Sequence, residues 1–174
     1  MSKIDNIYAA VDDFGLVTSE EASQLGMSRA ELVQQAHMGK LVRVARGVYR
    51  MPVWPSQAQA PYAIAVKSAG KDAFLYGESV VALLELAPTN PSKIWLASSK
   101  RCRRNLGQGV SVRQISNVDP VLIEGIPCQP IMHAILAAAQ TMGVKRAVAA
   151  AQEALKKGYI TPCEATRIEQ ELLP

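Results

Sequence analysis

The sequence predicts an α+β protein in which short helices and a β-hairpin form a first domain, followed after a proline-rich linker by a mixed α/β domain that ends in helices. Three observations support this prediction. Two helix-start signals lie ten residues apart near the N-terminus. Two β-prone runs flank a glycine turn directly after them, and three prolines within ten residues then interrupt the chain.

The first expected helix covers residues 3–14. Apolar side chains recur along it at helical spacing and would form one buried stripe: Ile4, Ile7, Tyr8, Val11 and Phe14. Such a stripe has to be covered by other elements. The segment is therefore predicted to be the first helix of a three-helix core.

Two further helices are predicted to be short and closely spaced. Thr18 with Glu21, and Ser28 with Glu31, each have the capping-box pattern, in which a hydroxyl accepts from a free backbone N–H and the acid accepts from the N-cap N–H. Gly26 ends the first of these helices, and a glycine ends the second as well. Two short helices around a turn of about three residues have helix-turn-helix spacing.

A β-hairpin is expected directly after the second helix. Residues 41–44 and 48–51 are β-prone, and the turn between them holds Gly47, where a positive φ is needed. A hairpin in this place makes the helix-turn-helix a winged one. Residues 1–52 are therefore predicted to be a winged helix-turn-helix DNA-binding domain.

The helix that begins at Ser28 is the expected recognition helix, the one that enters the DNA groove. A projection at about 100° per residue directs one set toward the core: Leu32, Val33 and Ala36. It directs another set outward: Ala30, Glu31, Gln34 and Met38. Outward Gln34 can pair with adenine, Arg29 with guanine, and the small Ala30 can contact a thymine methyl group.

Cations on and before the hairpin are predicted to lie along a phosphate backbone. The predicted DNA contacts from the recognition helix and from the hairpin region together are Ser28, Arg29, Ala30, Gln34, His37, Lys40, Arg43, Arg46 and Arg50. The alternative is a helical hairpin that only packs, with its polar side chains in solvent.

Residues 53–61 are predicted to be a linker and residues 62–174 a C-terminal α/β domain. Short β-prone runs there alternate with turn residues: 73–76, 94–97, 110–115 and 121–124. Helices are expected at 61–69 and 78–86 and from residue 130 to the end, where Thr161 and Glu164 form a third capping box.

The net charge of +4 is unevenly distributed, because residues 93–113 hold six cations and no acid. Such a block favours a polyanion or an acidic protein face. The second basic patch predicted from it consists of Lys100, Arg101, Arg103, Arg104 and Arg113. DNA phosphate and an acidic partner surface remain alternatives for what it binds.

Composition argues against export, membrane insertion and metal binding. The N-terminus carries acids where a signal peptide needs an apolar run, and no stretch of about 18 apolar residues exists. The three cysteines lie far apart, with no C-x-x-C pattern and two histidines in the chain. We therefore expect a cytoplasmic protein without membrane association, metal or cofactor.

Several short runs resemble the N-terminal winged helix of AbiEi-type antitoxins from type IV toxin–antitoxin systems. They are Gly15-Leu-Val-Thr, Glu21-Ala, Leu25-Gly-Met-Ser and Gly39-Lys-Leu-Val-Arg-Val-Ala-Arg-Gly-Val-Tyr-Arg. The resemblance is looser over residues 76–84 and 93–97, which look like the start of that family's C-terminal domain. The resemblance implies a repressor of its own operon that also neutralises a nucleotidyltransferase-like toxin. Neutralisation would not necessarily require the two proteins to bind each other.

Catalysis is not expected. A Cys-His nucleophile has no local signature here, the carboxylates of the second half are scattered, and Gly107-Gln-Gly109 precedes a predicted strand instead of the helix that a phosphate loop requires. The predicted function is a DNA-binding repressor and antitoxin acting as a dimer or on repeated sites. The alternatives are a protein-interaction module without DNA binding and a winged-helix nuclease.

Overall fold

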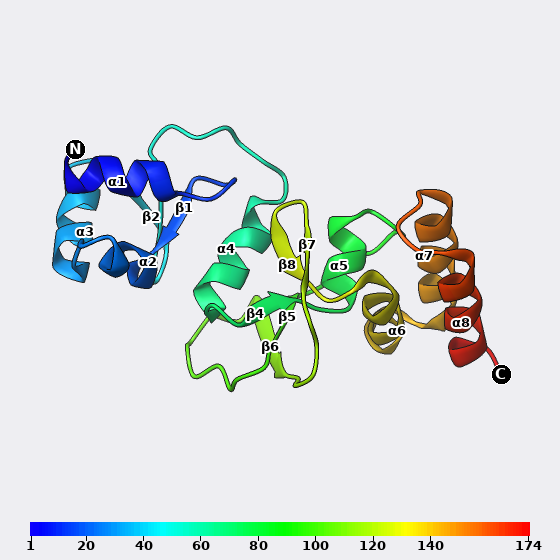
Figure 1. Cartoon of the computed structure of the whole chain (residues 1–174). Helices are drawn as coiled ribbons and strands as arrows, with labels where there is room; N and C mark the ends of the chain where they lie inside the picture. The colour runs from blue at the N-terminus through cyan, green and yellow to red at the C-terminus, as the bar shows by residue number, and fades with distance from the viewer. The chain divides into compact units, whose positions relative to one another are not determined.

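The computed structural model of the protein describes all residues from Met1 to Pro174 and confirms a mixed α+β architecture. The chain forms two compact units, Met1–Ser68 and Ala69–Pro174 (Figure 1). None of its helices combines the length and the apolar composition that crossing a bilayer demands.

The first unit consists of three helices, three strands and a fourth helix that follows an extended segment. Its elements are α1 (Lys3–Ala10), β1 (Leu16–Thr18), α2 (Ser19–Gln24), α3 (Arg29–His37), β2 (Val42–Ala45), β3 (Val48–Arg50) and α4 (Ala60–Ala69). Both predicted capping boxes are present. The Glu21 N–H donates to the Thr18 hydroxyl over 3.1 Å, and the Glu31 N–H donates to the Ser28 hydroxyl over 3.2 Å.

The hairpin is part of a three-stranded antiparallel sheet of order β1-β3-β2. Gly47 has the expected positive φ, at 73°, in the turn between β2 and β3. Strand β1 was not predicted, because three residues are too few to show an alternating pattern. Its pairing with β3 places β3 in the centre of the sheet, so that only β1 and β2 are edge strands.

The core of the first unit contains the buried residues Ile7, Val17, Ala22, Met27, Leu32, Leu41 and Tyr49. Two predictions were wrong here. Helix α1 ends at Ala10, because Val11 is extended at φ −64° and ψ 150°, and Phe14 is buried from a loop instead. Val33 was assigned to the core but is 44% exposed, because it lies about 100° around α3 from the buried Leu32.

The segment predicted as a linker is held against the first unit. The indole N–H of Trp54 and the amide of Gln57 both donate to the Asp13 carbonyl, over 3.3 and 3.0 Å. In α4, Lys67 lies 3.0 Å from a carboxylate oxygen of Glu21. The compact units therefore divide after Ser68, later than the sequence-based division into residues 1–52, 53–61 and 62–174.

The second unit is built on a five-stranded mixed sheet of order β6-β5-β4-β8-β7. Its strands are β4 (Ala73–Leu75), β5 (Ile94–Ser98), β6 (Val110–Gln114), β7 (Val121–Ile123) and β8 (Ile126–Cys128). Its helices are α5 (Glu78–Leu83), α6 (Ile131–Met142), α7 (Val144–Lys156) and α8 (Pro162–Leu172). Strand β8 was not predicted, because Pro127 interrupts the β-prone run.

Three helices complete this unit at its C-terminal end. The small side chains of α7 are buried, as an alanine face that permits close helix packing: Ala147, Ala150, Ala151 and Ala154. Helix α8 begins at the third predicted capping box, where the Glu164 N–H donates to the Thr161 hydroxyl over 3.2 Å.

Candidate nucleic-acid interface

Helix α3 presents one continuous exposed face. All the side chains predicted to meet DNA from this helix and its cap are exposed: Ser28, Arg29, Ala30, Gln34 and His37. Ala30, Gln34 and His37 follow a spacing of three or four residues, so they lie on one side of the helix. That side is opposite to Leu32, which is fully buried in the core.

Val33 also belongs to this exposed face, which sequence reasoning missed. On a helical projection it falls about 40° from His37, beside the stripe formed by Ala30 and Gln34. Leu32 and Ala36 are one turn apart and suffice to anchor a nine-residue helix on the core. Spacing alone does not place Val33 outside, because Val33 and Ala36 are also about one turn apart.

An acid beside the start of α3 is neutralised by its neighbours. The Lys3 ammonium lies 2.6 Å from a Glu31 carboxylate oxygen, and the Ser28 N–H donates to the other oxygen over 2.7 Å. These contacts, the Lys3 contact first, lower the pKa of Glu31 to about 2. The carboxylate is thus compensated where an anionic ligand would approach the N-terminus of the helix.

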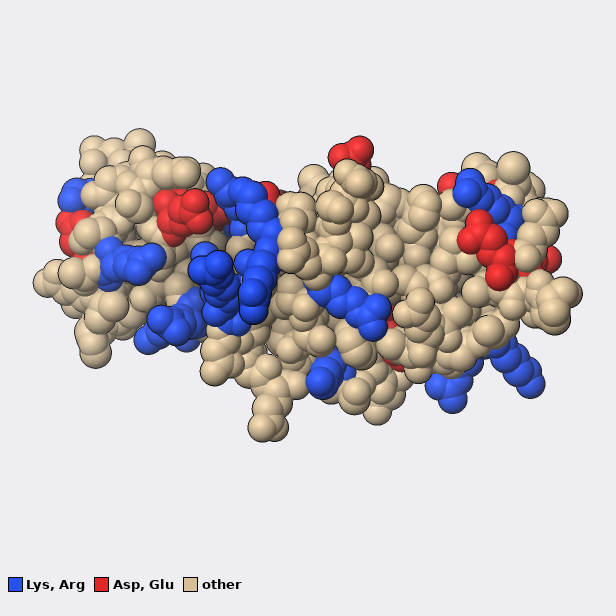
Figure 2. All heavy atoms as spheres, turned by 90° about the horizontal axis from the view of Figure 1, so that it is seen from below, with Lys and Arg blue, Asp and Glu red and all other residues tan.

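The wing, which is the hairpin of β2 and β3, exposes two of its predicted cations. Arg43 on β2 and Arg46 in the turn are both exposed, as is Lys40 just before β2. Figure 2 shows one face of the molecule, on which Lys and Arg side chains are exposed at several places. Arg50 is set apart from these residues: it lies on the central strand β3, half-buried, and its buried Nε has no hydrogen-bond partner.

The second basic patch separates into two parts in the structure. The first is the basic loop, which we define as residues 100–104 between β5 and β6, with all four of its cations exposed. Lys100 lies 3.5 Å from a carboxylate oxygen of Asp72, an acid that is distant in sequence. The second part is Arg113 on β6, whose guanidinium lies over the rings of Tyr76 and Trp95.

Groups that would serve metal or nucleophilic chemistry are not brought together. No group of three or more His, Cys, Asp or Glu side chains is placed to hold a metal ion. Cys128 is fully buried, and burial raises the pKa of its thiol to about 12. Because the thiolate is the reactive form of cysteine, this side chain is a neutral packing group at ordinary pH.

Helices α2 and α3 with the β2–β3 hairpin define the class of winged helix-turn-helix proteins. Within that class, residues 7–52 match the family described as transcriptional regulator, AbiEi antitoxin, which confirms the resemblance over this segment. The match supports a regulatory role.

The fold extends beyond the matched segment in one solved structure. The crystal structure of the RV2827C protein from Mycobacterium tuberculosis is similar over 96% of this chain and 69% of that chain, with a TM-score of 0.52 and 16% sequence identity. At that identity the similarity shows a shared fold alone. None of the curated proteins matches the chain.

Proposed function

We propose that the protein is a transcriptional repressor that binds the operator of its own operon and acts as the antitoxin of a type IV toxin–antitoxin system in the cytoplasm. Its toxin would be a nucleotidyltransferase-like enzyme. The observation that carries the proposal is the exposed face of α3 beside an arginine-bearing wing, in a segment that matches the AbiEi regulator family.

Helix α3 would enter the major groove, which is wide enough to admit an α-helix. Gln34 would pair bidentately with adenine, and Arg29 near the N-terminus of the helix would approach guanine or a phosphate. Ala30 and Val33 would contact thymine methyl groups. This combination of amide and apolar groups favours a half-site that contains A·T base pairs.

The wing would hold the protein on the DNA backbone without reading sequence. Lys40, Arg43 and Arg46 would each neutralise a phosphate and release counterions, so that affinity falls steeply as salt rises. Arg50 was included among the predicted contacts, but its half-buried guanidinium makes it the weakest of them.

A gel shift tests the proposal directly. The protein is expected to retard a duplex that covers the region upstream of its own gene more strongly than an unrelated duplex of equal length, at about 50 mM salt. Unaltered mobility of both duplexes would reject the repressor. If toxin neutralisation persisted in that case, the protein would be an interaction module.

We predict that Gln34→Ala weakens operator binding at one base pair. The expected cost is about 1 to 3 kcal/mol, because one base is left without its bidentate partner. Binding should be measured against operators with each base pair replaced in turn, and the variant should show no discrimination at a single position. Gln24→Ala, which removes an exposed glutamine from α2, is the matched control and should bind like the wild type.

We predict that the basic loop contributes to the salt dependence of DNA binding. Replacing Arg101, Arg103 and Arg104 by alanine should reduce the slope of log K against log[salt] by about 0.9 for each phosphate that is no longer neutralised. The control removes the same charge from exposed helical positions, by replacing Lys145, Arg146 and Lys156. An unchanged slope together with a failure to neutralise the toxin would assign the loop to a protein partner.

A further inference from the structure

The second unit contains a pocket whose floor comes from three adjacent strands. Trp95 lies in β5, Tyr76 directly follows β4, and the Tyr76 N–H donates to the Trp95 carbonyl over 2.9 Å. Arg113 in β6 pairs with Ala97, two residues beyond Trp95 on the same face of β5. The pairing register therefore brings the two rings and the arginine to one face of the sheet.

The guanidinium of Arg113 lies across both rings. Its Cζ is 5.7 Å from the centroid of Tyr76 and 5.9 Å from that of Trp95, both within the range of cation–π contacts. No carboxylate forms a salt bridge with Arg113. Ring faces stabilise a cation without neutralising its charge, so Arg113 keeps a full positive charge at an exposed position available to an anion.

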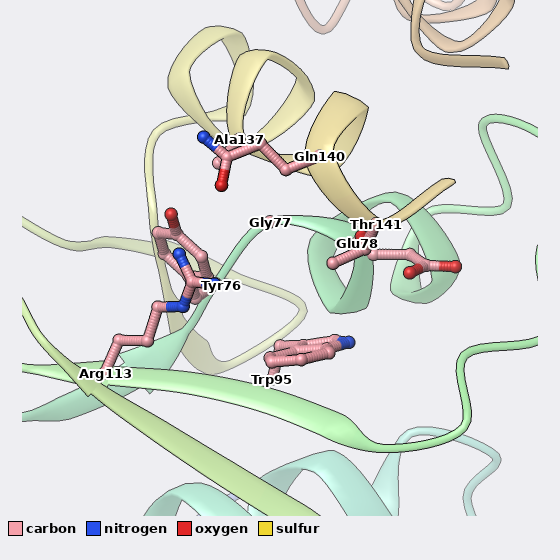
Figure 3. Close-up of a pocket in the computed structure, with 8 residues that line it drawn as sticks. All are labelled: Tyr76, Gly77, Glu78, Trp95, Arg113, Ala137, Gln140 and Thr141. Atoms are coloured by element: carbon pink, nitrogen blue, oxygen red, sulfur yellow. The ribbon is translucent and has the colours of Figure 1, made fainter. Parts of the chain in front are cut away.

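The end of α6 forms the opposite wall of the pocket. Gln140 and Thr141, which are exposed, line it together with Gly77 at the start of α5 (Figure 3). Gly77 is fixed by its N–H, which donates to the buried Gln129 side chain over 3.1 Å. The Thr141 hydroxyl donates to the Ala138 carbonyl over 3.2 Å, which leaves the Gln140 amide as the polar group of this wall that can meet a ligand. The space between the walls is too small for a ligand ring, so a ligand would lie on its solvent side.

The backbone that carries these rings is held in place by buried side chains. The Ser79 hydroxyl, fully buried, accepts from the Trp95 N–H over 2.7 Å. The carboxylate of Glu78, also buried, accepts a hydrogen bond from the Thr89 hydroxyl. The pocket is therefore a preformed feature of the second unit, and its polar supports are already satisfied.

We propose that this site binds a nucleotide on its solvent side, with the base stacked on the outer face of the Arg113 guanidinium, which the two rings support from below, and the phosphate at the guanidinium edge. Bases stack on aromatic side chains and on arginine planes, and such stacking is tolerant of base identity. The Gln140 amide can donate and accept at a base edge. An acidic peptide would engage the charge of Arg113 but would leave the flat outer face of its guanidinium unused.

The nucleotide has two possible sources, a free mononucleotide or the end of a single strand. The basic loop leaves β5 at Ser98, which pairs with Gln114, the residue after Arg113. Its cations therefore follow the end of β5 that lies beside Arg113, whereas Trp95 and Tyr76 lie nearer the other end of that strand. From there the cations would extend a phosphate track beyond Arg113. A strand end would contact these cations as well as Arg113, whereas a free nucleotide would contact Arg113 alone, so their affinities should differ.

The experiment follows the two tryptophan indole N–H signals by NMR, with the Trp95 signal assigned from Trp95→Phe. AMP, GMP, CMP and UMP are titrated separately, alongside inorganic phosphate and a 5′-phosphorylated single-stranded octanucleotide. The Trp95 signal is expected to shift in a saturable manner with nucleotides and not with inorganic phosphate. Trp54, bonded to Asp13 in the first unit, is the internal control and should not shift.

Arg113→Gln is expected to weaken nucleotide binding at least tenfold, since it removes a charged hydrogen-bond donor. Arg103→Gln, which removes the same charge from the basic loop, should leave mononucleotide affinity unchanged. Tighter binding of the octanucleotide than of every mononucleotide supports a strand end, and equal binding supports a free nucleotide. No shift of Trp95 with any nucleotide, or equal affinities for wild type and Arg113→Gln, would overturn the proposal.

Discussion

Replacing Arg43 and Arg46 together by alanine is expected to lower operator affinity roughly 100-fold without destabilising the fold. Both side chains are exposed, and neither forms a salt bridge within the protein. In the complex each would donate a charged hydrogen bond to phosphate, and two such bonds at about 1.5 kcal/mol or more account for the weaker binding. The salt slope should also fall by about 1.8, or 0.9 for each phosphate.

A charge-matched control separates specific phosphate contacts from general electrostatics. Lys145 and Arg146 are exposed at the start of α7, and their replacement by alanine removes the same total charge. This control should keep most of the affinity and nearly all of the salt slope. Equal reductions in the two double variants would show that the wing is not the phosphate-binding surface.

Gly15→Ala is expected to destabilise the first unit by roughly 2 to 5 kcal/mol. Gly15 has φ +71°, and a left-handed conformation costs a non-glycine residue about 1 to 2 kcal/mol. An added Cβ would lie 2.5 Å from Cδ2 of the Trp54 ring, so the indole would have to move, at a cost of about 1 to 3 kcal/mol. Denaturant unfolding monitored by circular dichroism measures the change in the free energy of unfolding.

Gly39→Ala is the matched control for this prediction. Gly39 has almost the same φ, at +73°, but no atom lies within 4 Å of an added Cβ. It should therefore show the backbone cost alone. Trp54→Ala should remove most of the difference between the two glycine variants, because the clashing ring is absent in that background. Equal destabilisation by both substitutions would mean that Trp54 does not pack on Gly15 in solution.

The helix-turn-helix could be predicted because its signals are local. A capping box depends on residues three positions apart, such as Thr18 and Glu21, and the glycine turn of the wing depends on Gly47 alone. Strand β1 could not be predicted in this way, since it exists through pairing with β3, which lies much later in the sequence. The family match over residues 7–52 agrees with where the local signals are strongest.

Features that depend on tertiary contacts were predicted wrongly or not at all. Val33 was assigned to the core because a helical projection has no fixed zero, and only the packing of Leu32 sets the angle at which α3 faces the core. The pocket joins Trp95 in β5 and Arg113 in β6 with Tyr76, which directly follows β4. Their register in the sheet brings them together, and no spacing in the sequence contains that register.

The central claim is that α3 and the wing form the DNA-binding face, and an NMR titration tests it most directly. Backbone amide signals are followed as an operator duplex is added to the isotope-labelled full chain. The largest shifts are expected on residues 28–38 and 43–47, with small shifts along the buried face of α1. Undisturbed signals at those positions, with DNA bound and shifts confined to other surfaces, would contradict it.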